Sequence, residues 1–129
     1  MRAIARALDR DDFEQVRAYL ADECEYLLDG ETLRGPTAVV ASYAEASDWA
    51  RRNLDAIRYE SVVGEPAGDG VPVRFIDHLE HGGRTHRHEC EQVFTVGPDG
   101  RVVRVVHREL PGQSEALAEF FRTCGLRRM

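Results

Sequence analysis

Residues 92–110 read QVFTVGPDGRVVRVVHREL, two segments rich in β-branched residues on either side of a glycine- and proline-containing turn. The turn Gly97-Pro98-Asp99-Gly100 is a strong β-hairpin signal, since each of its residue types favours a tight reversal of the chain. We therefore predict a long strand over residues 84–96 and a return strand over 101–110. This hairpin establishes an antiparallel sheet in the second half of the chain.

Two further strands are predicted immediately before the hairpin. Residues 57–63 alternate in the period of a strand, and residues 71–80 form the next strand after a loop with three glycines and a proline. A turn at His81-Gly82-Gly83 connects this strand to the hairpin. Four consecutive strands joined by short turns predict an antiparallel meander.

The first half of the chain is predicted to be mainly helical. Residues 4–20 favour a helix bent near Asp9, with Asp11 and Glu14 as a capping box. A short strand over 24–28 follows, and Gly35-Pro36 begins another helix. A last short helix is predicted to start with Ser114 as its cap. Helices segregated from an antiparallel sheet indicate an α+β fold, with helices on one face of the sheet and residues 1–129 as one domain.

The composition excludes several classes of function. The chain has 129 residues with 17 Lys+Arg against 23 Asp+Glu, a net charge of −6. Such a chain repels phosphate backbones and anionic lipids, so we expect no nucleic acid and no membrane as partners. It contains no apolar run near the roughly 20 residues that span a bilayer, and no signal peptide is expected. Three widely spaced cysteines favour reduced thiols and a cytoplasmic location.

Two stretches together resemble a known superfamily. They are ALDRDDFEQVRAYLADECEYLLDGETLRGPTAVVASYAEA, residues 7–46, and the hairpin at 92–110. Their layout is similar to the nuclear-transport-factor-2-like superfamily, in particular its SnoaL-like polyketide cyclase branch. The resemblance implies a cone-shaped (cystatin-like) fold, in which a strongly curved, mostly antiparallel sheet is wrapped by helices around one pocket. It also implies a homodimer and a small apolar ligand or substrate, without a cofactor.

The catalytic residues of two members of this superfamily are not complete here. The three positions of the ketosteroid isomerase site fall on Leu28, Ile4 and Gln92, none of which can take the corresponding role. The three positions of limonene epoxide hydrolase fall on Asp77, His107 and Phe75, so one carboxylate of that set is present. We therefore predict neither of these two activities.

The hairpin register decides which polar side chains meet. His86, His88, Cys90, Gln92 and Phe94 alternate along one strand and share a face, which the resemblance turns into the cone. A four-residue loop puts Cys90 opposite His107 and His88 opposite Glu109. A three-residue loop with a glycine bulge puts Glu91 opposite His107 instead. The local sequence allows both registers, and the family layout favours the first.

Two hypotheses for function follow. In the first, His107 carries general acid–base chemistry with Asp77 or Glu109 as its partner, in a cofactor-independent isomerase, dehydratase, cyclase or hydrolase. In the second, the domain keeps the cavity for ligand binding or dimerisation without catalysis. The predicted pocket lining, besides His107, is His88, Cys90, Gln92, Phe94, Phe75, Val105, Tyr26, Tyr43 and Trp49.

We expect no metal site. Alternate residues of a strand lie about 6.6–6.8 Å apart, so His86 and Cys90 are too far apart to bind one ion. At most His88, Cys90 and His107 converge. The cysteines also contain no CxxC pair of the kind that holds structural zinc.

Overall fold

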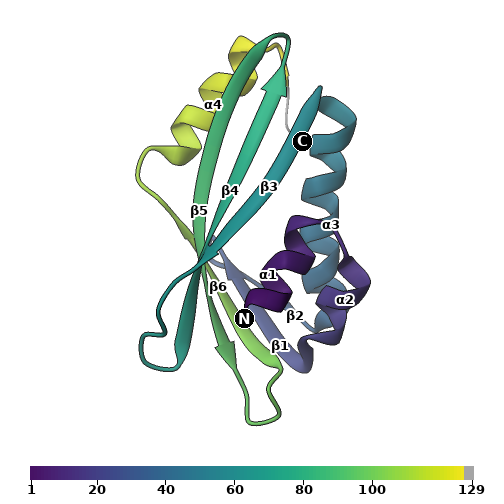
Figure 1. Ribbon diagram of the computed structural model, residues 1–129, viewed down its shortest axis with the longest axis vertical. Helices are drawn as coiled ribbons and strands as arrows, with labels where there is room; N and C mark the ends of the chain where they lie inside the picture. Colours follow the sequence, from purple (N-terminus) through teal and green to yellow (C-terminus); the bar gives the residue numbers. More distant parts are fainter. Residues whose placement is uncertain (127–129) are drawn as a thin grey trace.

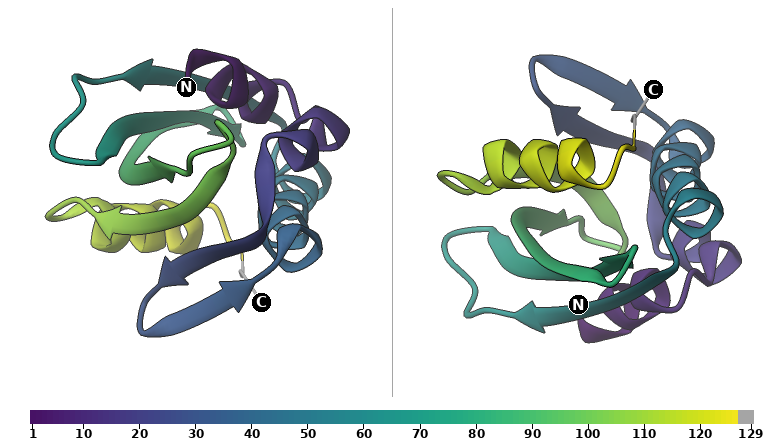
Figure 2. Two further views of the ribbon diagram at one scale, coloured as in Figure 1. Left: turned by 90° about the horizontal axis from the view of Figure 1, so that it is seen from below. Right: turned by 90° about the horizontal axis from the view of Figure 1, so that it is seen from above.

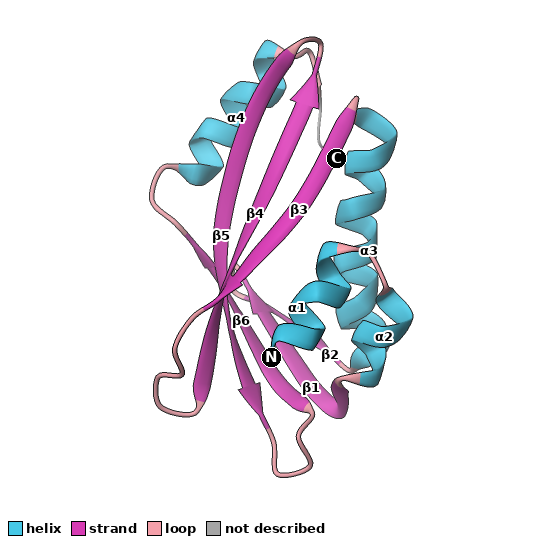
Figure 3. Ribbon diagram, viewed as in Figure 1, coloured by secondary structure: helices cyan, strands magenta, loops and turns pink. Residues whose placement is uncertain are grey.

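The computed structural model describes residues 1–126, which form one six-stranded sheet and four helices (Figures 1 and 3). The strands lie in the order β2-β1-β6-β5-β4-β3. Neighbouring strands are antiparallel except for β1 and β6, which are parallel. The strands are β1 (Leu20–Leu28), β2 (Glu31–Arg34), β3 (Ala56–Val63), β4 (Gly70–His81), β5 (Arg84–Val96) and β6 (Val102–Glu109). The predicted α+β class and mostly antiparallel sheet are confirmed.

The helices lie against the curved sheet (Figure 2). They are α1 (Arg2–Asp9), α2 (Phe13–Ala18), α3 (Pro36–Asn53) and α4 (Gln113–Thr123). The first three gather on one side, where α1 contacts β3 and α3 contacts β1, while α4 contacts β5. Within the described part of the chain, no helix is long and apolar enough to cross a bilayer.

The break between the first two helices differs from the predicted capping box. The N-cap of α2 is Asp12, whose Oδ1 accepts a hydrogen bond from the Gln15 backbone N–H at 3.3 Å. Asp11 instead adopts a left-handed backbone conformation with φ 56°. This conformation turns the Asp11 side chain away from the helix end, so that it can reach α3.

Two other elements also differ from the sequence prediction. A hairpin joins β1 to β2 through Asp29 and Gly30, with φ 48° and 77°, which is the geometry of a two-residue hairpin turn. The sequence analysis missed β2, because its four residues are mostly exposed and lack an apolar alternation. Gly112 precedes α4 as its N-cap, and the Ser114 hydroxyl donates to Glu109 instead.

The hydrophobic core fills the space between the sheet and the first three helices. Phe94, Val73 and Val105 are at most 1% exposed and pack with the buried side chains of α1. Phe94 and Val105 belong to this core and are not among the residues that line the cavity, contrary to the prediction. A second cluster joins Phe120 and Phe121 of α4 to the end of α3 and to β4.

The β5–β6 register differs from both predicted alternatives. Near the turn Val96 is opposite Val102, whereas Thr95 is opposite Arg104, so Val103 has no residue opposite it. This bulge shifts the rest of the ladder and places His107 opposite Gln92. The predicted pairing of Cys90 with His107 is thus wrong by two residues, and Glu109 takes that place. A shift of two residues leaves every side chain on the same face.

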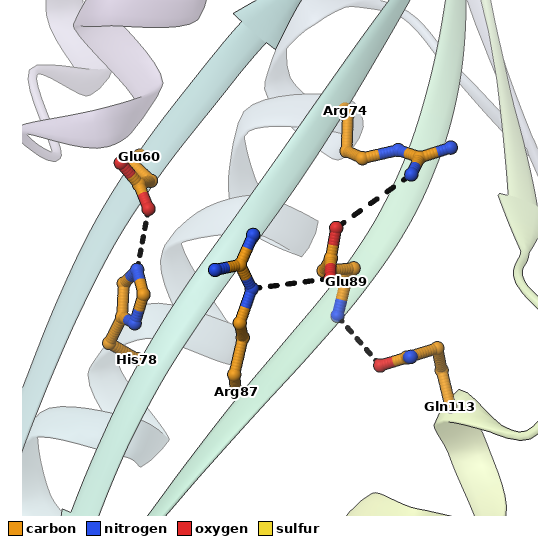
Figure 4. A network of polar contacts seen from close by, with 6 residues as sticks. All are labelled: Glu60, Arg74, His78, Arg87, Glu89 and Gln113. Carbon is orange, nitrogen blue, oxygen red and sulfur yellow. Dashed lines mark hydrogen bonds and ion pairs between the residues drawn. The ribbon is translucent and has the colours of Figure 1, made fainter.

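The outer face of β3, β4 and β5 carries a network of charged side chains (Figure 4). His78 Nε2 lies 2.6 Å from Glu60 Oε1, and Glu89 contacts both Arg74 and Arg87 at 3.8 and 3.2 Å. In the registers of these strands, Ile76 is paired with Glu60 and with Glu89, and it is only 5% exposed. The network therefore surrounds an apolar side chain on the face opposite the core.

We predict that Phe94→Ala lowers the free energy of unfolding by about 3–5 kcal/mol, because it leaves a cavity in a fully packed region. Urea unfolding measures the change. Val62→Ala is the control, since Val62 is 57% exposed and its truncation should change stability by no more than about 0.5 kcal/mol. A loss below about 1 kcal/mol for Phe94→Ala would contradict the assignment of Phe94 to the core.

Candidate functional site

A cavity of about 580 Å³ opens between the inner face of the sheet and the helices. This volume lies in the range of sites for small organic molecules. Its lining residues come from all four helices and from five of the strands. Among the described residues, β2 contributes none to the lining. Of the residues predicted for the site, the lining includes Tyr26, Tyr43, Trp49, Phe75, Asp77, His88, Cys90, Gln92, His107 and Glu109.

A buried amide lies at the centre of the polar wall. Gln92 is 4% exposed, and its Oε1 accepts a hydrogen bond from the Tyr43 hydroxyl at 2.5 Å. Its Nε2 donates to the Tyr26 hydroxyl at 2.8 Å and lies 3.2 Å from His107 Nδ1. The amide therefore connects α3, β1, β5 and β6 through one side chain. A buried amide needs such partners, because an unsatisfied polar group inside a protein costs about 1–3 kcal/mol.

His107 forms a second contact with a carboxylate. Its Nε2 lies 2.9 Å from Glu109 Oε1, and Ser114 Oγ donates to Glu109 Oε2 at 2.9 Å. Since the Gln92 amide donates to Nδ1, the neutral ring carries its hydrogen on Nε2 and donates it to Glu109. Burial raises the pKa of Glu109, but the hydrogen bonds from His107 and Ser114 outweigh burial, and the net pKa is lowered. Glu109 is thus an ionised partner for the imidazole.

Cys90 lies beside these groups but is poorly suited to act as a nucleophile. Glu109 is opposite Cys90 in the sheet, and Asp77 is opposite the neighbouring inward residue His88. Burial, with added repulsion from Asp77 and Glu109, raises the pKa of the Cys90 thiol to about 12. A thiol reacts through its thiolate form, so Cys90 is unreactive in this environment.

The tyrosines of the polar wall stay protonated. Burial raises the pKa of both Tyr26 and Tyr43. Their rings are tilted by 58° with centroids 5.4 Å apart. Both residues therefore present neutral hydroxyl groups to the cavity, and Tyr43 uses its hydrogen for Gln92.

The opposite wall holds a second group of polar residues, of which sequence analysis missed Ser47, Asp11 and Arg51. Ser47 Oγ donates to Asp11 Oδ2 at 2.6 Å, and the Tyr59 hydroxyl donates to Ser47 Oγ at 3.0 Å. Arg51 Nε donates to the same Asp11 oxygen at 2.7 Å. These residues come from the break after α1, from α3 and from β3, and no sequence motif connects these segments.

His86 shares a strand face with the site residues of β5 but lies outside the cavity. His86 stacks on Phe120 with centroids 5.1 Å apart and an interplanar angle of 20°, and it is not part of the cavity lining. Burial lowers its pKa. Among residues 1–126, no group of three or more His, Cys, Asp or Glu side chains is arranged to hold a metal ion.

The sequence matches no protein-family model, and no curated protein matches it. Solved structures do match. TerC, co-crystallised with polyporic acid, is 16% identical with a TM-score of 0.69, and the match covers 93% of each chain. A Xanthomonas campestris protein, provisionally assigned as a polyketide cyclase, is 20% identical with a TM-score of 0.66, covering 94% of this chain and 90% of that one.

An NTF2-like protein of Burkholderia pseudomallei is 19% identical with a TM-score of 0.65, and the match covers 95% of this chain and 92% of that one. This chain has the NTF2-like fold. A Mycobacterium tuberculosis protein in complex with estradiol-17β-hemisuccinate is 18% identical with a TM-score of 0.60. It covers 87% of this chain and 92% of the other. The implied cone, a curved sheet wrapped by helices, is therefore confirmed as the fold.

We predict that Glu109→Gln destabilises the protein near neutral pH and that this difference disappears in acid. A carboxyl whose pKa is lowered by folding stabilises the protein above its unfolded pKa, about 4.3, and loses that contribution as pH falls through the folded pKa. The gap in melting temperature between wild type and Glu109→Gln should be present from about pH 7 to 5 and close below about pH 4.

Glu23→Gln is the matched control, because Glu23 is exposed on β1 and lies outside the cavity lining. This variant should follow the wild-type melting curve throughout the same pH range. A gap for Glu109→Gln that persisted unchanged at pH 3 would contradict the role of ionised Glu109.

Proposed function

We propose that the cavity binds a small, largely apolar molecule and that His107 transfers a proton to or from it, with Glu109 as its partner. One observation carries this proposal. A histidine on the cavity wall donates through Nε2 to an ionised carboxylate, while its other ring nitrogen is directed to the Gln92 amide. This arrangement is the orientation that a general base needs.

The proposed proton transfer uses His107 Nδ1. A bound molecule that replaces the weak 3.2 Å contact from Gln92 can give its proton to Nδ1. Glu109 then stabilises the imidazolium through the Nε2 hydrogen, and the proton returns to a second atom of the same molecule. The Tyr26 hydroxyl, on the same wall, is a neutral donor for negative charge that develops on the substrate.

The comparisons support a ligand site but leave the reaction open. Two proteins of this fold were crystallised with polyporic acid and with a steroid ester. A third is provisionally assigned as a polyketide cyclase. Our proposal is therefore a SnoaL-like cyclase, isomerase, dehydratase or hydrolase that needs no cofactor, and the cyclase name of this third protein supports it. The chain contains 17 arginines and no lysine, so a Schiff base on a lysine side chain is not available to it.

A non-catalytic ligand-binding domain is the second candidate. The observation in its favour is that both ring nitrogens of His107 already have protein partners, Gln92 and Glu109. In this alternative the polar wall serves only to satisfy buried groups and to orient the ligand. The two candidates share the cavity and differ in whether His107 exchanges a proton.

The first test is to replace His107 by Asn once a substrate has been found by thermal-shift screening. We expect the rate to fall by about 10²–10⁴-fold, because Asn keeps a polar group of similar reach but exchanges no proton near neutral pH. His78→Asn is a matched control on the outer face, where His78 pairs with Glu60, and it should keep the wild-type rate. If the His107→Asn protein kept the wild-type rate, His107 would not be the acid–base residue, and the non-catalytic ligand-binding domain would be the better candidate.

We also propose that the protein is a cytoplasmic homodimer. The dimer follows from the resemblance to SnoaL-like proteins and from partly exposed Val93 and Val106 on the outer face of the sheet. Val102 of β6 does not contribute to this face, since it lies in the core. The three unpaired thiols are compatible with a reducing compartment.

Light scattering tests the oligomeric state. A dimer of this 14.6 kDa chain has a mass near twice that value at micromolar concentration. Replacing Val106 with Arg places a charge on the outer face and should shift the population toward the monomer. A wild-type mass near 14.6 kDa would rule out the dimer.

A further inference from the structure

The charges that line the cavity have one sign. Among the described residues of the lining there are six carboxylates and no arginine, and the chain has no lysine. Only two lining side chains, His88 and His107, are able to carry a positive charge. The six acidic residues are Asp9, Asp11, Asp29, Glu45, Asp77 and Glu109.

The six carboxylates have different surroundings. Asp29, Glu45 and Glu109 are exposed. Asp11 is paired with Arg51, and Asp9 accepts a hydrogen bond from Ser61 Oγ at 2.6 Å. The two carboxylates of the inner sheet face are Asp77 on β4 and Glu109 on β6, with β5 between them, and Glu109 also contacts His107 and Ser114.

The field of the two sheet carboxylates reaches other groups of the cavity. The Cys90 thiol has its pKa raised first by burial and then by both Asp77 and Glu109. On β3, burial raises the pKa of Tyr59, the Ser47 hydrogen bond and Arg51 lower it, and Asp11 and Asp77 raise it. The Asp77 charge thus acts on side chains of two different strands.

Aromatic rings form much of the remaining wall. Tyr26, Tyr43 and Phe75 line the sheet and α3 side, and Trp49 packs edge-on against Phe121 at 5.2 Å between centroids. The faces of aromatic rings attract cations. The Arg51 guanidinium lies 5.5 Å from the centroid of Tyr59, so one lining ring already holds a cationic group from the protein.

We propose that the cavity selects molecules that carry an ammonium group on an apolar body, and that it disfavours carboxylates. The aromatic and aliphatic walls bury the apolar body, while the Asp77 and Glu109 side chains attract the cation across β5. An anion in the same place meets two carboxylates, and no arginine or lysine is among the described residues that line the cavity. This inference rests on the proposed function, because it names the ligand class of the same cavity.

The test uses three ligands that share one adamantane cage and differ only in charge. They are 1-adamantylmethylammonium, 1-adamantylmethanol and 1-adamantanecarboxylate, all transparent at the excitation wavelength of tryptophan. The single tryptophan of the chain, Trp49, lines the cavity, so its fluorescence reports occupancy directly. We expect the ammonium to bind about tenfold more tightly than the alcohol, and the alcohol more tightly than the carboxylate.

The ranking in the wild-type protein separates the two proposals. Equal affinities, or a preference for the carboxylate, would overturn the cation selectivity and leave the apolar pocket in place. Failure of all three to bind at millimolar concentration would overturn the pocket and the selectivity together. Neither result depends on a variant that folds poorly.

A matched pair of variants locates the effect. Asp77→Asn should weaken the ammonium about fivefold or more and leave the alcohol unchanged, because it removes one charge from the cavity. Glu23→Gln removes the same charge outside the lining and should change neither affinity. An equal loss of ammonium affinity in the two variants would show that the net charge of the protein, rather than the cavity, attracts the cation.

Discussion

The hydrogen bonds of the Gln92 amide hold together the parts of the chain that form the site. Its oxygen accepts from Tyr43 on α3, and its nitrogen donates to Tyr26 on β1 and to His107 on β6. Gln92 is almost completely buried, so each of these bonds avoids the cost of an unsatisfied polar group. Any rearrangement of α3 against the sheet would break at least one of them. The amide therefore ties α3 to the sheet and orients His107.

This interaction depends on a bulge in the neighbouring ladder. The turn is closed by the Gly97 N–H, which donates to Arg101 O at 2.8 Å, and a regular ladder continued from that pair would place Glu91 opposite His107. Such a ladder would turn His107 to the outer face, because side chains alternate along a strand. The extra residue Val103 restores His107 to the inner face and brings it opposite Gln92. Bulges also increase the local twist, in keeping with the strong curvature of this sheet.

The cavity has two polar walls with different chemistry. On one wall the imidazole of His107 lies between an amide and an ionised carboxylate, an arrangement suited to moving a proton. On the other wall Asp11 is held by Ser47 and Arg51, and its charge is compensated within the protein. The proposed ligand therefore meets apolar surface, a hydrogen-bonding histidine and the field of the sheet carboxylates. Cys90 lines the cavity, but its thiol stays protonated and is therefore unreactive.

The sequence by itself determined the order of the elements other than β2, the α+β class and which residues share each face of β5. Turn residues such as Gly82-Gly83, and the alternation from His86 to Phe94, are local properties, and a strand keeps its two faces whatever its neighbours are. The family resemblance brought Asp77 and His107 forward as candidates, and the hairpin register that it favours added Glu109. Their roles in function remain predictions.

Tertiary structure decided which of these side chains meet. The bulge at Val103, the left-handed conformation of Asp11 and the packing of Phe94 and Val105 into the core depend on contacts between distant segments. The Asp11–Ser47–Tyr59 wall likewise joins three segments that share no motif. A one-residue change of register exchanges the two faces of a strand, and the free energy that selects the register comes from the packed sheet and helices rather than from the turn alone.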